Sequence, residues 1–213
     1  MNYFNILLKR NLPAGKAICK AFCFSILFLG ILQKVSALTF TVTSTGDTHA
    51  VSPTTSALDG SGQVTLRSAV EAATQIGGSH TIIIPAGNYT LTLGQITLGN
   101  SGAGNNITIQ GAGKASTTIT QTTVNRVFST GLGAVTIFIS DLSINYSGPA
   151  GTISGGGGAI VSGGVGASTT LTNVAISNFN IQIGNGGALL CSASSGTNNL
   201  TLTNCDFTNN YAG

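Results

Sequence analysis

Five acidic side chains are the candidates for carboxylate chemistry in this sequence. They are Asp47, Asp59, Glu71, Asp141 and Asp206. Hydrolysis of a glycosidic bond requires two carboxyl groups about 5–10 Å apart, and a polysaccharide lyase requires several carboxylates together with an arginine or lysine base. Because the five acids are scattered along the chain, their spacing indicates neither arrangement.

Asp141 and Asp206 are the only acids that follow Arg126. In the repeats described below, they occupy different strand positions and lie two repeats apart. At about 4.8 Å per stacked strand, their axial separation alone is about 10 Å, at the upper edge of the range for an inverting pair. We therefore predict that the acids are solvated residues of turns and side-chain ladders, and we predict no catalytic residue, cofactor site or metal site.

The basic and nucleophilic side chains do not indicate a catalytic site either. Arg126 precedes an apolar pair and could serve as a lyase base, but an exposed strand residue is the simpler interpretation. His49 and His80 have no serine or cysteine partner at a suggestive spacing, so we predict surface histidines. Cys191 and Cys205 show no CxxC pattern, and they could form either a disulfide or a pair of free thiols.

Three stretches of the chain nearly repeat one another, and they would position these side chains. They cover residues 135–146, 169–180 and 200–211. Ile144, Ile176 and Phe207 align about 31–32 residues apart, a period typical of solenoids in which each repeat is one supersecondary unit. Within each copy, apolar residues alternate with threonine and asparagine, as in a half-buried strand.

The equivalent residues Asn173 and Asn204 could stack their amides as a ladder, as identical strands do when they lie in register. Charged residues make up only 6% of the chain, against about 25% in a typical domain. Threonine, serine and asparagine therefore form the polar surface. The pattern predicts an all-β, parallel β-helix, that is, a solenoid of stacked strands.

One helix is predicted, over residues 65–73, with Thr65 as its N-cap. An apolar stripe at helical spacing marks its buried face. The stripe consists of Leu66, Ala69, Val70 and Ala73. Arg67 and Glu71 stand four residues apart and are expected to pair on the opposite face. A short helix placed before the repeats would cap the open N-terminal end of the solenoid.

Residues 1–37 have the pattern of a secretory signal peptide. Basic residues precede the apolar run 21–32, and Val35-Ser36-Ala37 resembles a cleavage site. An uncleaved membrane anchor is the alternative, but the run is shorter than the about 20 residues that a span needs. After cleavage the net charge would be 3 − 5 = −2. No basic patch would then remain, which disfavours nucleic-acid binding.

The part of the chain that precedes the repeats resembles the CSLREA-type N-terminal region of bacterial surface proteins. The resemblance covers residues 40–47, 64–73 and 82–92. Leu66, Arg67 and Ala69 match the motif, whereas Val64 and Ser68 stand where the motif has cysteine and glutamate. This resemblance implies the opening cap of a right-handed parallel β-helix.

The later part resembles the repeats of polymorphic outer-membrane proteins of the autotransporter type. Residues 157–160 and 186–189 match the Gly-Gly-Ala-(Ile/Leu) element, and residues 207–210 match Phe-x-x-Asn. Residues 176–179 are a degenerate copy of the second element. This resemblance implies a surface passenger domain.

The expected organisation is a signal peptide at 1–37, a cap with the first strands at 38–95, and β-helix coils at 96–213. The coils are expected to be open at their C-terminal end, which would make the chain an N-terminal portion of a longer protein. End-to-end contact at the last coil is a further expectation, because an uncovered coil exposes a strand edge.

The expected function is display or adhesion by an exported, extracellular or outer-membrane-associated protein without catalytic activity. Its partners would be host-surface or glycan ligands, and membrane association would depend on missing C-terminal regions. The alternative is a polysaccharide lyase or glycosidase whose active site lies in missing coils. A groove lined by acids, arginine and aromatic residues would favour the enzyme, and a smooth threonine and asparagine face would favour the passenger domain.

Overall fold

The computed structural model describes residues 36–99, 104–131, 133–149, 151, 153, 156–181, 184–192 and 196–213. The predicted signal peptide lies outside the described residues, apart from its last two positions. Among the described residues, no helix combines the length and the apolar character that crossing a membrane requires.

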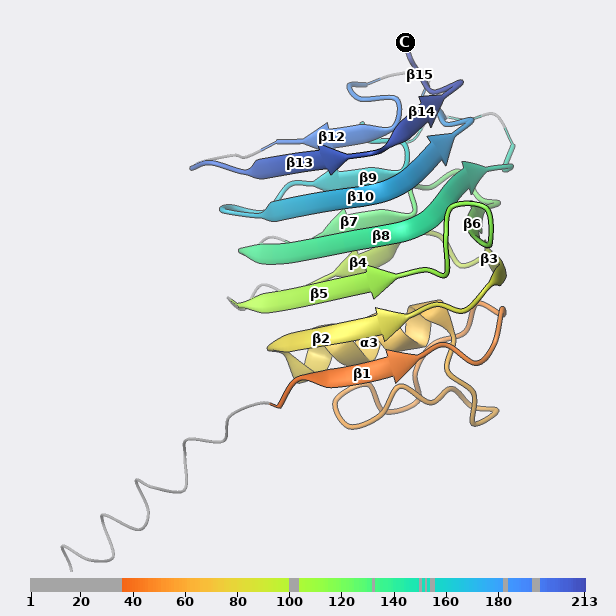
Figure 1. Cartoon of the computed structure of the whole chain (residues 1–213), viewed down its shortest axis with the longest axis vertical. Coiled ribbons are helices and arrows are strands. Elements are labelled where there is room, and N and C mark those ends of the chain that lie inside the picture. The colour runs from red at the N-terminus through yellow and green to blue at the C-terminus, as the bar shows by residue number, and fades with distance from the viewer. Residues whose placement is uncertain are drawn as a thin grey trace, which may run out of the picture. The chain divides into compact units, whose positions relative to one another are not determined.

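The described chain forms a solenoid of parallel strands (Figure 1). The longest path of paired strands runs β1 (Leu38–Thr41), β2 (Ser79–Ile83), β5 (Asn105–Gln110), β8 (Val135–Tyr146), β10 (Ser168–Ser177) and β13 (Asn199–Thr203). The same sheet includes β3 (Gly87–Leu91), β6 (Thr117–Gln121) and β14 (Asp206–Thr208). The architecture confirms the predicted parallel β-solenoid, which has about four turns.

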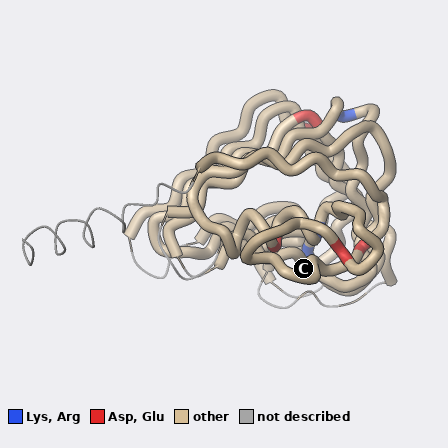
Figure 2. Tube along the Cα trace, turned by 90° about the horizontal axis from the view of Figure 1, so that it is seen from below, with Lys and Arg blue, Asp and Glu red and all other residues tan. Residues whose placement is uncertain are grey.

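Two further sheets complete the coils. One contains β4 (Ile96–Leu98), β7 (Phe128–Thr130), β9 (Ile160–Ser162) and β12 (Leu189–Cys191), and the other pairs β11 (Asn180–Ile181) with β15 (Tyr211–Ala212). Seen along the stack, successive coils superpose, and lysine, arginine, aspartate and glutamate are sparse on the trace (Figure 2). Each coil therefore contributes strands to more than one wall around a shared core.

The core consists of columns of aliphatic side chains that lie in register from coil to coil. One column on the longest path contains Ile82, Ile109, Ile139 and Leu171, all fully buried. On the opposite wall, Phe128 pairs in register with Ile160, and both are buried. Burial of such side chains stabilises a fold by about 1.5–3 kcal/mol each, which explains why the apolar alternation sets the register.

The asparagines near the bends of the long strands form the expected ladder. Asp141, Asn173 and Asn204 occupy left-handed backbone positions, with φ of 58°, 57° and 53°. Asn173 donates to Asp141 Oδ1 at 2.7 Å, and Asn204 donates to Asn173 Oδ1 at 3.1 Å. Asparagine and aspartate tolerate this conformation better than other residues that have a Cβ, so these positions can turn the strand from one wall of the coil to the next.

A second ladder, which the sequence analysis did not predict, links Asn145, Asn178 and Asn209. The amide of Asn178 donates to Asn145 Oδ1 at 2.8 Å, and the amide of Asn209 donates to Asn178 Oδ1 at 3.3 Å. Asn178 and Asn209 are also left-handed, with φ of 68° and 55°. Stacked side chains therefore link successive coils at two separate positions.

The single described helix, α3 (Leu66–Ile76), begins with a reciprocal capping box between Thr65 and Ser68. It ends at Gly77, whose φ of 73° suits glycine. Its apolar stripe is buried in the core with β2 and β4, and the helix covers the N-terminal end of the stack (Figure 1). The predicted capping helix is confirmed, and it extends three residues beyond its expected end at residue 73.

Two expectations about basic side chains are wrong. His80 is buried rather than on the surface: its ring contacts the carbonyl oxygen of Gly77 and accepts from the N–H of Leu38, because its position on β2 points inward. Arg126 is half-buried in the loop before β7 and donates to the side chain of Gln95 and the carbonyl of Gly156. Burial lowers the pKa of Arg126.

Cys191 and Cys205 are free thiols in the structure. Cys205 Sγ lies 3.5 Å from the carbonyl oxygen of Leu171 and 3.4 Å from that of Thr203. Cys191 pairs in register with Ser162 on the neighbouring coil. Of the two alternatives left open by the sequence, the structure has the free thiols.

Candidate functional site

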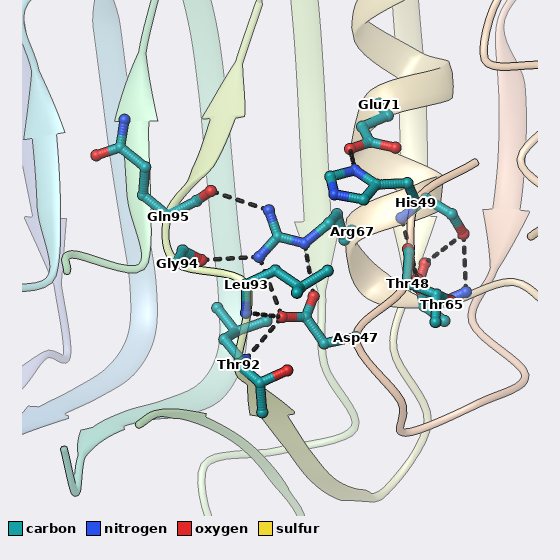
Figure 3. Close-up of polar contacts among 12 residues, drawn as sticks. Asp47, Thr48, His49, Thr65, Arg67, Glu71, Thr92, Leu93, Gly94 and Gln95 are labelled. Carbon is teal, nitrogen blue, oxygen red and sulfur yellow. Dashed lines mark hydrogen bonds and ion pairs between the residues drawn. The ribbon is translucent and has the colours of Figure 1, made fainter. Parts of the chain in front are cut away.

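The strongest polar cluster joins the first turn of α3 to the preceding loop (Figure 3). Arg67 donates from Nε and Nη2 to the two carboxylate oxygens of Asp47, at 2.6 and 3.1 Å. Their side chains are only 4% and 1% exposed. The expected pairing of Arg67 with Glu71 is therefore wrong, because a buried guanidinium requires a buried carboxylate and the helix surface does not supply one.

The Arg67–Asp47 pair also fixes the loop that leads into β4. Arg67 donates to the carbonyl oxygens of Gln95 and Gly94, at 2.9 and 2.7 Å. Asp47 accepts from the backbone N–H groups of Thr92 and Leu93, at 2.7 and 2.8 Å. Helix, loop and first coil are thus joined through two side chains.

The environment of Asp47 shifts its acidity in opposing directions. Burial raises the pKa of Asp47, whereas the hydrogen bond from Arg67 and the backbone N–H groups of Leu93 and Thr92 lower it. The net effect is a pKa below the ordinary value. Asp47 is consequently held as a carboxylate and does not serve as a proton donor near neutral pH.

A second pair lies on the outer face of the helix. His49 Nδ1 lies 2.5 Å from Glu71 Oε1, and Glu71 Oε2 accepts from the N–H of Ala50 at 2.9 Å. An ionised carboxylate only accepts hydrogen bonds, so Nδ1 carries the proton in this pair. The other ring nitrogen, Nε2, remains available on a side chain that is 64% exposed.

These groups surround a pocket of about 450 Å³ beside α3. Its lining consists of His49, Arg67, Glu71, Thr74, Gln75, Gln95, Ile96, Thr97 and Gly99. In Figure 3, Gln95 lies on one side of the Arg67 guanidinium and His49 and Glu71 lie on the other. The volume is within the range of about 300–1,000 Å³ typical of small-molecule sites.

The lining of the pocket offers hydrogen-bonding groups of several kinds. Glu71 is its only lining carboxylate, and Asp47 is engaged by Arg67. Among the residues that the structure describes, no cluster of three or more histidine, cysteine, aspartate or glutamate side chains could hold a metal ion. The arrangement is suited to binding a polar molecule.

The expectation that the acids are solvated is wrong for Asp47 and Asp59, which are buried because they accept hydrogen bonds from neighbouring groups. The other acids also have structural partners. Asp59 accepts from the Thr48 hydroxyl and from the N–H groups of Ser61 and Gln63. The hydroxyl of Thr48 and the N–H of Gln63 lower the pKa of Asp59 despite an opposing effect of burial. Asp141 begins the first amide ladder, and the exposed Asp206 accepts from Lys114 at 2.7 Å.

The residues singled out from the sequence lie in several places. Leu66, Ala69 and Val70 lie on the buried face of α3, and Arg67 lies at the centre of the polar cluster. Asn173 and Asn204 are in the first ladder, and Cys191 and Cys205 lie in the last coils. The sequence analysis missed the pocket, because its other lining residues follow no motif. The turn-forming Gly46-Asp47 pair was the one available signal for the partner of Arg67.

Comparison with known proteins found no family model, no curated protein and no solved structure that matches this chain. The structure shows the fold of the chain, which is a parallel β-solenoid with a helical N-terminal cap.

Proposed function

We propose that this protein is a bacterial surface β-solenoid that works by display or adhesion and has no catalytic activity. The observation that carries the proposal is the use of the carboxylates. Each of the five acids in the sequence has a partner that stabilises the fold: a buried arginine, a loop hydroxyl, a histidine, a ladder amide or a surface lysine. No acid is left for the paired carboxyl groups of a glycosidase.

Sequence features support the cellular setting of this proposal. The N-terminal segment 1–37 has the pattern of a signal peptide. The CSLREA-like segment around Leu66 and the Gly-Gly-Ala repeats resemble those of exported surface proteins. The outward faces of the strands are rich in threonine and asparagine, as in a surface that presents contacts without a reactive centre.

The location is tested by expressing the full chain in a bacterium and treating intact cells with protease. The proposal predicts cleavage of the solenoid without lysis and a mature N-terminus at or near Leu38. Protection of the chain in intact cells, or recovery of residues 1–37 in a membrane fraction, would contradict export with cleavage.

The absence of catalysis is tested by incubating the protein with pectins, alginates and β-glycans, with and without calcium. The proposal predicts no new reducing ends and no unsaturated products. Turnover that disappears in Asp141→Asn or Asp206→Asn would overturn the proposal. Because Asp206 is exposed, its substitution should leave the fold intact.

A further inference from the structure

We infer that the pocket beside α3 is a binding site for one or two rings of a neutral sugar. The inference deepens the proposed function and rests on it, because it names the class of ligand that an adhesive solenoid would hold. Three features carry it: an unused donor on a buried guanidinium, charges of both signs at the lining, and a wall of exposed polar side chains.

Arg67 supplies the unused donor. A guanidinium has five N–H donors, and four of those of Arg67 bind Asp47 twice, the carbonyl of Gln95 and the carbonyl of Gly94. The fifth, on Nη1, has none of these partners. The side chain is 4% exposed and lines the pocket. A ligand oxygen can accept a hydrogen bond from this N–H, and all five donors of Arg67 would then be paired. Leaving a donor of a buried charged group unpaired is costly.

The charges around the pocket disfavour an ionic ligand. The positive charge of Arg67 is neutralised by Asp47 at 2.6 Å, and Glu71 faces His49 at 2.5 Å. An anionic sugar would approach the carboxylate of Glu71, whereas a cationic one would approach Arg67. A neutral ligand that both donates and accepts hydrogen bonds can interact with Glu71 and with Arg67 together. Sugar hydroxyl groups have this property.

The remaining wall offers mixed donors and acceptors. Gln75 and Thr97 are exposed at the pocket, and His49 Nε2 is not engaged by Glu71. The Gln95 side chain receives a hydrogen bond from Arg126 on its oxygen, which leaves its amide nitrogen to donate. The volume of about 450 Å³ accommodates a sugar of one or two rings.

The two histidines of the chain allow a direct test by NMR. His49 lies at the pocket, and His80 is a buried residue of β2 that pairs with Leu38 of β1. The full chain is titrated with D-glucose, D-galactose and N-acetyl-D-glucosamine, and with D-galacturonate and D-glucosamine as charged probes. We expect the imidazole signals of His49, and not those of His80, to shift with at least one neutral sugar, with a Kd of about 1 mM.

Variants of the pocket then separate this site from other surfaces. His49→Ala and Gln75→Ala should each weaken binding about 3- to 10-fold, the effect of one hydrogen bond. Because His49→Ala removes the imidazole probe, binding to the variants is followed through the backbone amide signals of the pocket residues. The matched control is Gln110→Ala, an exposed glutamine on β5 outside the pocket, and it should leave the Kd unchanged.

Three results would overturn the inference: no shift with any neutral sugar, tighter binding of a charged probe, or binding that both pocket variants leave unchanged. None of these bears on export or on the absence of turnover, so the proposed function would stand. Conversely, sugar binding followed by cleavage of a glycoside would preserve the site and overturn the non-catalytic proposal.

Discussion

The first and the last described coils differ in how much of their apolar core is covered. At the N-terminal end, α3 covers the first coil, and Leu66 is fully buried. In the last described coil, Leu202 is 44% exposed and Phe207 is 43% exposed, although their partners one coil earlier, Leu171 and Ile176, are buried. Within the described residues, members of a column that have a coil or the helix on each side are buried, and those of the last described coil are partly exposed.

The difference shows that the repeats and the cap are specified by different interactions. Within the repeats, side chains of one type stack on their equivalents, so neighbouring coils satisfy one another. The cap cannot rely on this repetition. It depends instead on residues that occur once, namely the apolar stripe of α3 and the buried pair of Arg67 with Asp47.

The largest effect is expected when a charge enters the covered end. Leu66→Asp should lower the free energy of unfolding by more than about 4 kcal/mol, because an unpaired carboxylate would lie in an apolar contact. Leu202→Asp, at the equivalent kind of position on β13, should cost much less because the side chain already reaches solvent. Urea denaturation followed by circular dichroism measures both, and equal losses would refute the role of α3 as a cap.

The next effect concerns the ion pairs of the two ends. Asp47→Ala should destabilise the fold by about 3–5 kcal/mol, because it leaves Arg67 charged and buried without its partner. Asp206→Ala, which breaks the exposed pair with Lys114, should cost less than about 1 kcal/mol. The same denaturation experiment compares them. A loss below about 1 kcal/mol for Asp47→Ala would mean that the pair does not hold the cap.

A smaller effect is expected in the amide ladder. Asn173→Ala should cost about 1–3 kcal/mol, because it removes two ladder hydrogen bonds and places alanine at φ of 57°. Asn173→Gly keeps the left-handed backbone accessible and should recover part of the loss. Thermal unfolding of the two variants distinguishes the contributions, and an alanine variant as stable as the wild type would show that the ladder is dispensable.

The smallest difference is expected in sensitivity to acid, because opposing contributions to the pKa of Asp47 partly cancel. Since its folded-state pKa is lowered, the carboxylate stabilises the fold above the ordinary value of 3.8, and this stability is lost as pH falls through the lower folded-state pKa. Unfolding free energies at pH 7 and pH 3 should therefore differ less in Asp47→Asn than in the wild type. An equal difference would place the acid sensitivity in other groups, such as Asp59.

The solenoid could be predicted from the sequence because its information is periodic. The spacing of Ile144, Ile176 and Phe207 gave the register of the coils, and the aligned Asn173 and Asn204 gave the ladder. His80 could also have been placed correctly. It stands two residues before the buried Ile82, so both side chains lie on the same face of β2, and it pairs in register with the buried Ile107 of the next coil.

The site could not be predicted in the same way. Arg67 and Asp47 are 20 residues apart and meet only after the helix has packed on the coil. The helical spacing rule therefore assigned Arg67 to Glu71, a neighbour on the surface, because it does not account for burial. Gln95 belongs to the site through its position before β4, which depends on where the chain returns after a full coil.

Hydrogen exchange of the backbone amides, resolved along the chain by mass spectrometry, tests the contrast between the two ends most directly. Protection reports local opening, so the account predicts slow exchange in α3, β2, β5 and β8 and faster exchange in β13, β14 and β15. Protection that is uniform along the stack, or highest in the last described coil, would contradict the conclusion that α3 and its buried ion pair close the N-terminal end of the coils.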